Sequence, residues 1–275
     1  ILALTDALDS VQMDDTAFRD AVESGVLYSC IVPGSGNIIG GQSAVIRNYA
    51  NDSTEALIAR AGLKAAFGYN PKSTHKWKGQ RPTTRMGAIA ILRGRLEEVR
   101  RKVQKYNKAK GSKKADITFS AEETVLQDLL AGKFRLRAHV HKIDDIAALL
   151  RLVDDYKLKL TVEHASDVHR PEIFQALRQR KVPVVYGPVD SFPYKVELKH
   201  EDWRNIHHLL AAKVEFGLMS DHPVTLARQL LLQTRWFLRA GLSKQQAIEL
   251  VSHKNARILG IDDRLGTLKK GKWAS

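Results

Sequence analysis

The sequence predicts an α/β fold whose parallel sheet is either open or closed into a barrel. Short β-rich runs alternate with segments of helical periodicity along the whole chain. Most of these runs are almost continuously apolar, which is typical of strands buried on both faces. Polar and ionisable residues gather where the runs end. The 275 residues are 44% hydrophobic, and they contain neither an internal repeat nor a low-complexity linker. We therefore expect residues 1–275 to form a single domain.

The expected elements follow from these patterns in chain order. Seven strands are predicted at residues 27–32, 42–47, 63–68, 135–140, 159–163, 182–186 and 214–219. Apolar residues at helical spacing lie between the later strands. These helices are expected to start near Ile143, near Pro171, near Leu226 and at the capping box Ser243-Lys-Gln-Gln246, and the last should end at Gly260.

Most of the net charge of +14 lies in one segment. Residues 76–114 contain fourteen lysines and arginines against only Glu97 and Glu98. Within this segment, apolar residues recur at helical spacing, so the basic residues occupy the opposite face of a helix. We interpret that face as the solvated side of a helix packed on the core. The alternative is a nucleic-acid-binding patch, but aromatic residues do not interleave with the basic ones as a stacking platform requires. The predicted apolar face consists of Ile89, Leu92, Leu96, Val99, Val103 and Tyr106.

Composition argues against membrane and disulfide-bonded classes. The longest charge-free run, residues 24–46, contains five glycines and a proline, so it would leave backbone groups unpaired in lipid. The single cysteine, Cys30, excludes an intramolecular disulfide and slightly favours a cytoplasmic location. It lies in an apolar strand, where we expect a buried thiol and not a nucleophile. A signal peptide on a longer parent protein stays open, because the sequence starts at Ile1.

Three residues at separate strand ends suggest a metal site. His139, His164 and Asp221 each follow a different strand, and the carboxyl ends of parallel strands share one edge of a sheet. Two imidazoles and a carboxylate can bind a divalent ion such as Zn²⁺ and leave a position open for water. His141 shares a face with His139 in an extended strand. His222 could contact a substrate if the chain turns after Asp221.

Motifs along almost the full chain resemble the amidohydrolase superfamily, specifically its imidazolonepropionase-like and Xaa-Pro dipeptidase (prolidase)-like branch. The matching stretches are Val32-Pro-Gly-Ser-Gly-Asn-Ile-Ile-Gly-Gly-Gln42, Arg85-Met-Gly87, His139-Val-His-Lys-Ile-Asp-Asp145, Glu163-His-Ala165, Ser220-Asp-His-Pro223 and Asn255-Ala-Arg-Ile-Leu-Gly-Ile-Asp-Asp-Arg-Leu-Gly-Thr-Leu268. The resemblance implies a metal-dependent hydrolase with a (β/α)8 TIM barrel, usually flanked by a β-sandwich built from both chain ends.

The resemblance also implies roles for individual residues. His139 and His164 would be the metal ligands on barrel strands 5 and 6. Asp221 would be the strand-8 aspartate, which is both a metal neighbour and the catalytic proton shuttle. The expected reaction is hydrolysis of a carbon–nitrogen bond in a small-molecule amide, a cyclic amide or a peptide-like substrate, with one divalent ion, Zn²⁺ being favoured. Substrate-binding candidates are His141, Tyr69, His222, Arg85 and Arg81, the arginines as partners of a substrate carboxylate.

Two departures from the family pattern shape the expectations. The strand-1 His-x-His pair and the β-sandwich halves are missing, so we expect an incomplete barrel that binds metal weakly or not at all and has little activity. Its open edges could support a homo-oligomer. The strand-4 exit offers Tyr69 and no carboxylate, which favours one metal ion over two. The alternatives are a non-catalytic binding or scaffold barrel, a deaminase and, last, a nucleic-acid binder; no membrane partner is expected.

Overall fold

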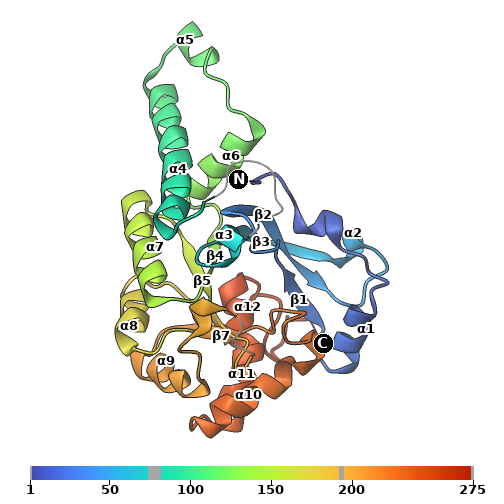
Figure 1. The fold of residues 1–275 in the computed structure, drawn as a ribbon. Helices are drawn as coiled ribbons and strands as arrows, with labels where there is room; N and C mark the ends of the chain where they lie inside the picture. Colours follow the sequence, from blue (N-terminus) through green and yellow to red (C-terminus); the bar gives the residue numbers. More distant parts are fainter. Residues whose placement is uncertain (1, 74–81, 192–194, 274–275) are drawn as a thin grey trace.

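A single curled sheet of seven strands organises the molecule, which a computed structural model describes over residues 2–73, 82–191 and 195–273. The strands pair in chain order, and the helices lie around the sheet (Figure 1). Each of the seven predicted strands overlaps an observed one, although the second and third start earlier than predicted, at Ile39 and Leu57. The strands are β1 (Tyr28–Ile31), β2 (Ile39–Arg47), β3 (Leu57–Ala66), β4 (Leu136–Val140), β5 (Leu160–His164), β6 (Val184–Tyr186) and β7 (Phe216–Leu218).

The expectation of a wholly parallel sheet is wrong for its first three strands. β3 to β7 are parallel, but β1 pairs antiparallel with β2, and β2 antiparallel with β3. The connections explain the difference. Residues 32–38 and 48–56 are too short for a crossover that would return the chain to the same end of the sheet, which takes about a dozen residues or more. The later connections carry helices and allow parallel pairing.

Helices fill the later connections and cover the outside of the sheet. The α-helices in chain order are α1 (Thr16–Glu23), α2 (Ser53–Ala56), α3 (Asn70–Ser73), α4 (Arg85–Lys108), α5 (Ser112–Ala115), α6 (Ala121–Leu130), α7 (Ile143–Tyr156), α8 (Pro171–Gln179), α9 (Ile206–Ala212), α10 (Leu230–Arg239), α11 (Lys244–Val251) and α12 (His253–Leu259). The short 3-10 turns are η1 (Ala7–Ser10), η2 (Val196–Leu198), η3 (Trp203–Asn205) and η4 (Ala227–Gln229). The capping box predicted at Ser243 and Gln246 opens α11. The single helix expected from there to Gly260 is instead two helices, because the backbone at Ser252 leaves helical geometry.

The main hydrophobic core lies between the parallel strands and helices α4, α6, α7 and α8. Fully buried side chains there include Leu92, Leu136 and Phe174. Burying a leucine or phenylalanine side chain stabilises a fold by roughly 1.5–3 kcal/mol. On β4 and β5, Arg137 and Glu163 form a buried ion pair with 2.8 Å between nitrogen and oxygen. The parallel strands are thus held rigidly, which fixes the positions of the residues that follow them. Of the described helices, none is both long and apolar enough to cross a membrane.

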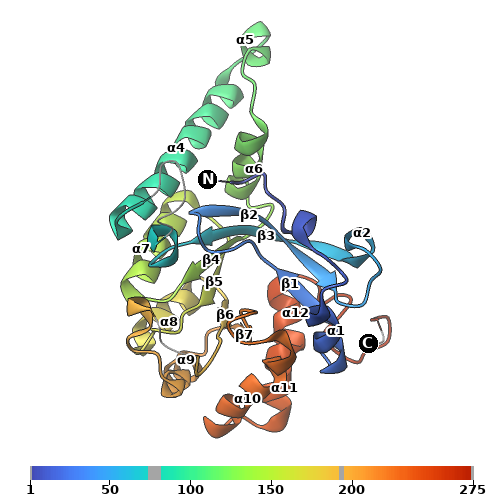
Figure 2. The same cartoon turned by 45° about the vertical axis from the view of Figure 1, so that its right-hand side comes forward.

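The basic segment forms α4, which projects with α5 away from the sheet (Figures 1 and 2). The apolar face predicted for it packs inward, and Leu92, Leu96 and Val99 are buried. Several basic side chains pair with acids of this helix or of α6, as Arg95 does with Glu122 at 2.7 Å. These pairs support a solvated helix face. Lys76, Lys78 and Arg81 lie outside the described residues.

A cavity of about 900 Å³ lies between the two edge strands of the sheet, β1 and β7. In the described ranges, each of these strands pairs on one side only, and the curled sheet stays open there (Figure 2). Cys30 of β1 and Asp221, just beyond β7, line the cavity. Because its two edge strands do not pair with each other, the sheet is a partial barrel.

Burial raises the pKa of the Cys30 thiol, which disfavours its reactive thiolate form.

Candidate metal centre

Two neighbouring parallel strands bring three histidines together. His139 is in β4, His141 follows that strand directly, and His164 is the last residue of β5. In register, His164 pairs with Val140, so alternation alone would place it on the other side of the sheet from His139. Its φ of 76° departs from strand geometry, and its ring lies 4.4 Å from that of His139. The strand ending thus creates the cluster.

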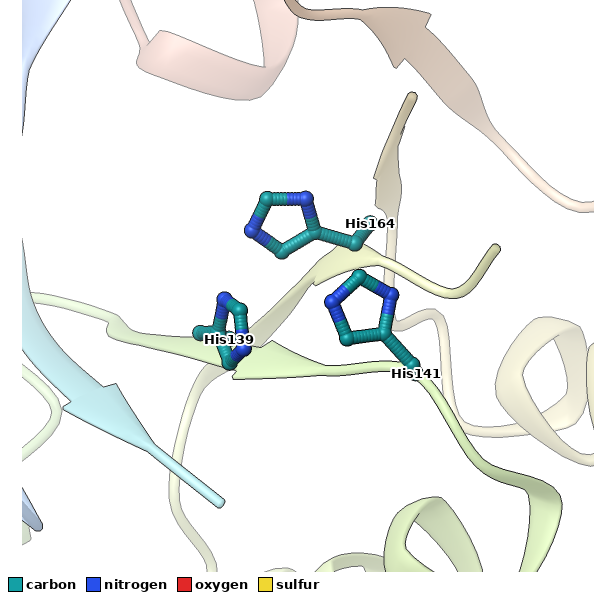
Figure 3. A group of neighbouring side chains, drawn as sticks. All are labelled: His139, His141 and His164. Carbon is teal, nitrogen blue, oxygen red and sulfur yellow. The ribbon is translucent and has the colours of Figure 1, made fainter. Parts of the chain in front are cut away.

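The three imidazoles face one another in an arrangement suited to a shared ligand (Figure 3). The ring centroids of His139 and His141 are 4.8 Å apart, as are those of His141 and His164. One nitrogen from each ring lies within 4.8 Å of those of the other two. We call His139, His141 and His164 the buried histidine cluster.

The nitrogens of the buried histidine cluster are unusual because few have a partner. All three residues are at most 4% exposed, and neither ring nitrogen of His139 or His141 makes a hydrogen bond within the described part of the chain. His164 Nδ1 lies 2.9 Å from the carbonyl oxygen of Gly187. If Nδ1 donates its proton there, Nε2 of His164 keeps a free lone pair. Buried polar atoms without partners cost about 1–3 kcal/mol each, and a bound cation would satisfy them.

The electrostatics keep these imidazoles uncharged. Burial lowers the pKa of His139 and of His141 well below the ordinary value, and the other histidines lower it further. Burial also lowers the pKa of His164, although the negative charge of Asp221 opposes this shift. Neutral imidazole is the form that binds metal ions. The residues present therefore fit a divalent cation.

Glu197 is a member of this site that sequence reasoning missed. It lies in η2, between β6 and α9, and is 3% exposed. Its Oε1 is 3.7 Å from His139 Nε2 and 3.9 Å from His141 Nε2. Burial raises the pKa of Glu197. η2 is neither a strand end nor part of an amphipathic pattern, so the sequence around Glu197 gave no sign of its role. The indication lay elsewhere in the chain, at Gly68 and Tyr69, where the strand-4 exit lacks the carboxylate that the family pattern has there.

Asp221 and His222 lie just beyond β7. Asp221 is partly buried and has a left-handed backbone, with φ of 53°. It is near enough to affect the pKa of His164, but its carboxylate is not among the donor atoms of the buried histidine cluster. His222 is exposed, and its Nδ1 accepts a hydrogen bond from the backbone N–H of Ala227 at 3.3 Å.

Two other predicted substrate-binding residues, Tyr69 and Arg85, lie on the side of the site where Glu197 is held. The side chain of Tyr69 is exposed, but its backbone N–H donates to Glu197 Oε2 at 2.6 Å. Arg85 Nε donates to Asp145 Oδ1 at 2.6 Å and leaves the side chain 44% exposed. The negative charge of Asp145 in turn contributes to the raised pKa of Glu197.

Comparisons with known proteins agree with this geometry. The family model described as "Amidohydrolase family" matches residues 89–275. The crystal structure of an amidohydrolase from Thermotoga maritima MSB8 is similar, with a TM-score of 0.89 and 33% identity over 98% of this chain and 70% of that one. "Amidohydrolase tasK" of Hapsidospora irregularis is 27% identical over 96% of this chain, which spans only 29% of that relative's length. A prolidase structure with bound N-methylphosphonate-L-proline matches over 56% of this chain and 41% of its own, at 18% identity and a TM-score of 0.42. The resemblance is confirmed at the level of the family: this chain belongs to the amidohydrolase family.

Proposed function

We propose that this chain carries the catalytic centre of a metal-dependent hydrolase that cleaves a carbon–nitrogen bond. The observation that supports it most is the buried histidine cluster, in which the ring nitrogens of His139 and His141 lack partners while burial lowers the pKa of both imidazoles. A structural barrel would gain nothing from keeping such groups in its interior. Membership of the amidohydrolase family fits this chemistry.

The buried histidine cluster would hold one divalent ion, Zn²⁺ in this proposal, with Asp221 beside it. Such an ion lowers the pKa of a bound water towards about 7 and polarises a carbonyl. Asp221 would act as the proton shuttle, taking the proton of the attacking water and delivering it to the leaving nitrogen. Its place after β7, at the same end of the sheet as His164, suits that role.

Substrate would enter beside Arg85. Its guanidinium is held by Asp145 through Nε and is 44% exposed, so its terminal N–H groups could bind a substrate carboxylate in bidentate fashion. Tyr69 and His222 expose side chains near the same rim. A carboxylate partner would suit the amides of the prolidase-like and imidazolonepropionase-like branch.

The open side of the sheet completes the proposal. A further strand in the gap between β1 and β7 would pair with the free edge of β1, and with β7 once the amide of Asn255 releases the backbone of Leu218. Such a strand would close the barrel and could bring additional ligands. We expected weak metal binding because the sequence offered three ligands, His139, His164 and Asp221. His141 and Glu197 are further donor groups beside them. We therefore propose that this chain binds a divalent ion measurably, and more tightly once the gap is filled.

Metal content and product chemistry test the proposal together. After incubation with Zn²⁺ and desalting, plasma mass spectrometry should find close to one ion per chain, and His139→Ala should remove it. N-acyl amino acids, dipeptides and cyclic amides should then be screened for amide cleavage, with ammonia release from amidines as the deaminase arm. Metal absent from this chain and from a version extended to fill the gap would favour the non-catalytic barrel instead.

A further inference from the structure

The carboxylate of Glu197 lies at the place where the third strand, β3, ends, although it comes from a different part of the chain. β3 ends at Ala66, and Gly68 follows with φ of 85°. A Cβ at Gly68 would lie 2.2 Å from Glu197 Oε2, so only glycine allows this approach. The backbone N–H of Tyr69 donates to the same oxygen at 2.6 Å. Gly68 and Tyr69 thus form a cradle that orients the carboxylate.

The second oxygen of Glu197 points to the histidines. Oε1 has no hydrogen-bond partner among the described residues, and it faces Nε2 of both His139 and His141 at 3.7 and 3.9 Å. These separations exceed hydrogen-bond length. No hydrogen bond therefore explains why this oxygen and the two imidazoles face one another.

A cation between these atoms would explain the distances. Carboxylate oxygens and imidazole nitrogens bind zinc at roughly 2.0–2.2 Å. An oxygen and a nitrogen on one ion are therefore at most about 4.3 Å apart, and both observed separations fall within that limit. An acceptor oxygen and two nitrogens that face one another without hydrogen bonds form a donor set that suits a cation.

We propose that Glu197 is a metal ligand, which supplies from the connection between β6 and α9 the carboxylate that the end of β3 lacks. This inference rests on the proposed function, because it assumes that the buried histidine cluster binds a divalent cation. It answers the departure noted at the strand-4 exit: Gly68 makes room for a carboxylate that comes from 128 residues beyond Tyr69.

The test compares two substitutions in the same connection. Glu197→Gln keeps the size of the side chain and an oxygen that can accept from Tyr69 N–H, but it loses the negative charge. Glu201→Gln is the matched control, because burial also raises the pKa of Glu201 while its oxygens bind Ser191 and not the histidines. Zn²⁺ affinity would be measured by competition with a chromophoric chelator, and Co²⁺-loaded protein by visible absorption. Unfolding curves would confirm that each variant is folded.

The expected result is a Zn²⁺ dissociation constant raised at least about tenfold in Glu197→Gln, an altered Co²⁺ spectrum, and neither change in Glu201→Gln. Glu197→Asp, which keeps the charge but shortens the reach, should also weaken binding and serves if the glutamine variant unfolds. Wild-type affinity and spectrum in folded Glu197 variants would overturn this inference alone, provided that His139→Ala loses the metal. Undiminished binding in His139→Ala, or no binding either in the wild type or in the version extended to fill the gap, would overturn the proposed function as well.

Discussion

Among the described residues, two groups of side chains each place three potential metal donors within 4.8 Å of one another, and they differ in almost every other respect. The first is the buried histidine cluster. The second, which we call the loop cluster, consists of Asp167, His169 and His200. In the loop cluster Asp167 is buried, but His200 is 42% exposed. Proximity alone therefore does not separate a metal site from an ordinary polar contact.

The difference lies in how completely each group is satisfied. Asp167 Oδ1 accepts from the backbone N–H of His200 at 2.6 Å, and Oδ2 lies 3.2 Å from the ammonium of Lys142. His169 Nδ1 lies 2.9 Å from the backbone oxygen of Asp167. The loop cluster thus ties the connection after β5 to the connection after β6. In the buried histidine cluster, by contrast, His139 and His141 have no such bonds among the described residues, and this unmet capacity indicates a ligand.

The largest expected effect comes from removing a member of the buried histidine cluster. His139→Ala should lower Zn²⁺ affinity by at least about two orders of magnitude and lower any hydrolase activity with it, because an unpartnered donor is lost. Equilibrium dialysis against Zn²⁺ measures the change. The matched variant His169→Ala, in the loop cluster, should keep wild-type affinity, and equal losses in both variants would erase the distinction between the clusters.

Removing the centre of the loop cluster should affect stability instead of metal. Asp167→Ala leaves the His200 N–H and the Lys142 ammonium without their acceptor, at a cost of about 2 kcal/mol in the free energy of unfolding. Urea unfolding of the metal-free protein gives this value. If Asp167→Ala instead removed bound Zn²⁺ without changing stability, the loop cluster would be the metal site.

Acid should destabilise the metal-free protein through the buried histidine cluster. Burial lowers the folded-state pKa of His139 and His141, so the unfolded chain, with histidine pKa near 6.5, binds protons first as pH falls. The contribution of these neutral imidazoles to the free energy of unfolding is full above about pH 6.5. It declines below that pH, by up to about 1.4 kcal/mol per pH unit for each histidine. Thermal unfolding between pH 7.5 and 5.5 should show this slope. His141→Asn should make the dependence of stability on pH shallower, because it removes one of the two titrating imidazoles. An unchanged slope in this variant would contradict the assignment of the acid effect to the buried histidine cluster.

A smaller effect is expected at the rim of the site. Arg85→Lys keeps a positive charge but loses the planar donors that could bind a carboxylate. We expect KM for a carboxylate-bearing amide to rise about tenfold, corresponding to roughly 1.4 kcal/mol, with metal content unchanged. A substrate amide without a carboxylate is the control, and an equal rise for both substrates would remove Arg85 from substrate binding.

Much of this comparison could be predicted from the sequence. Apolar runs located all seven strands, and those of β4 to β7 are continuous because these parallel strands are buried on both faces. The convergence of their ends then brought His139, His141 and His164 to one place. The sequence did not distinguish ligand from substrate contact for His141, since that depends on the left-handed turn at His164.

Other features depended on contacts between distant segments. Glu197 meets Gly68 and Tyr69 only in the folded chain, and no periodicity in its own connection reveals it. The antiparallel pairing of β1, β2 and β3 follows from the short connections between them. The general alternation of strands and helices along the chain led us to expect parallel pairing there too. The break at Ser252 between α11 and α12 also had no signal in the apolar spacing.

The central claim is that unsatisfied nitrogens, and not proximity alone, identify the metal centre. The most direct measurement is anomalous X-ray diffraction at the zinc edge from crystals of this protein grown with an equimolar amount of Zn²⁺. The account predicts one strong peak about 2.1 Å from nitrogens of His139, His141 and His164, and none at Asp167 and His200. A peak at the loop cluster with none at the buried histidine cluster would contradict it.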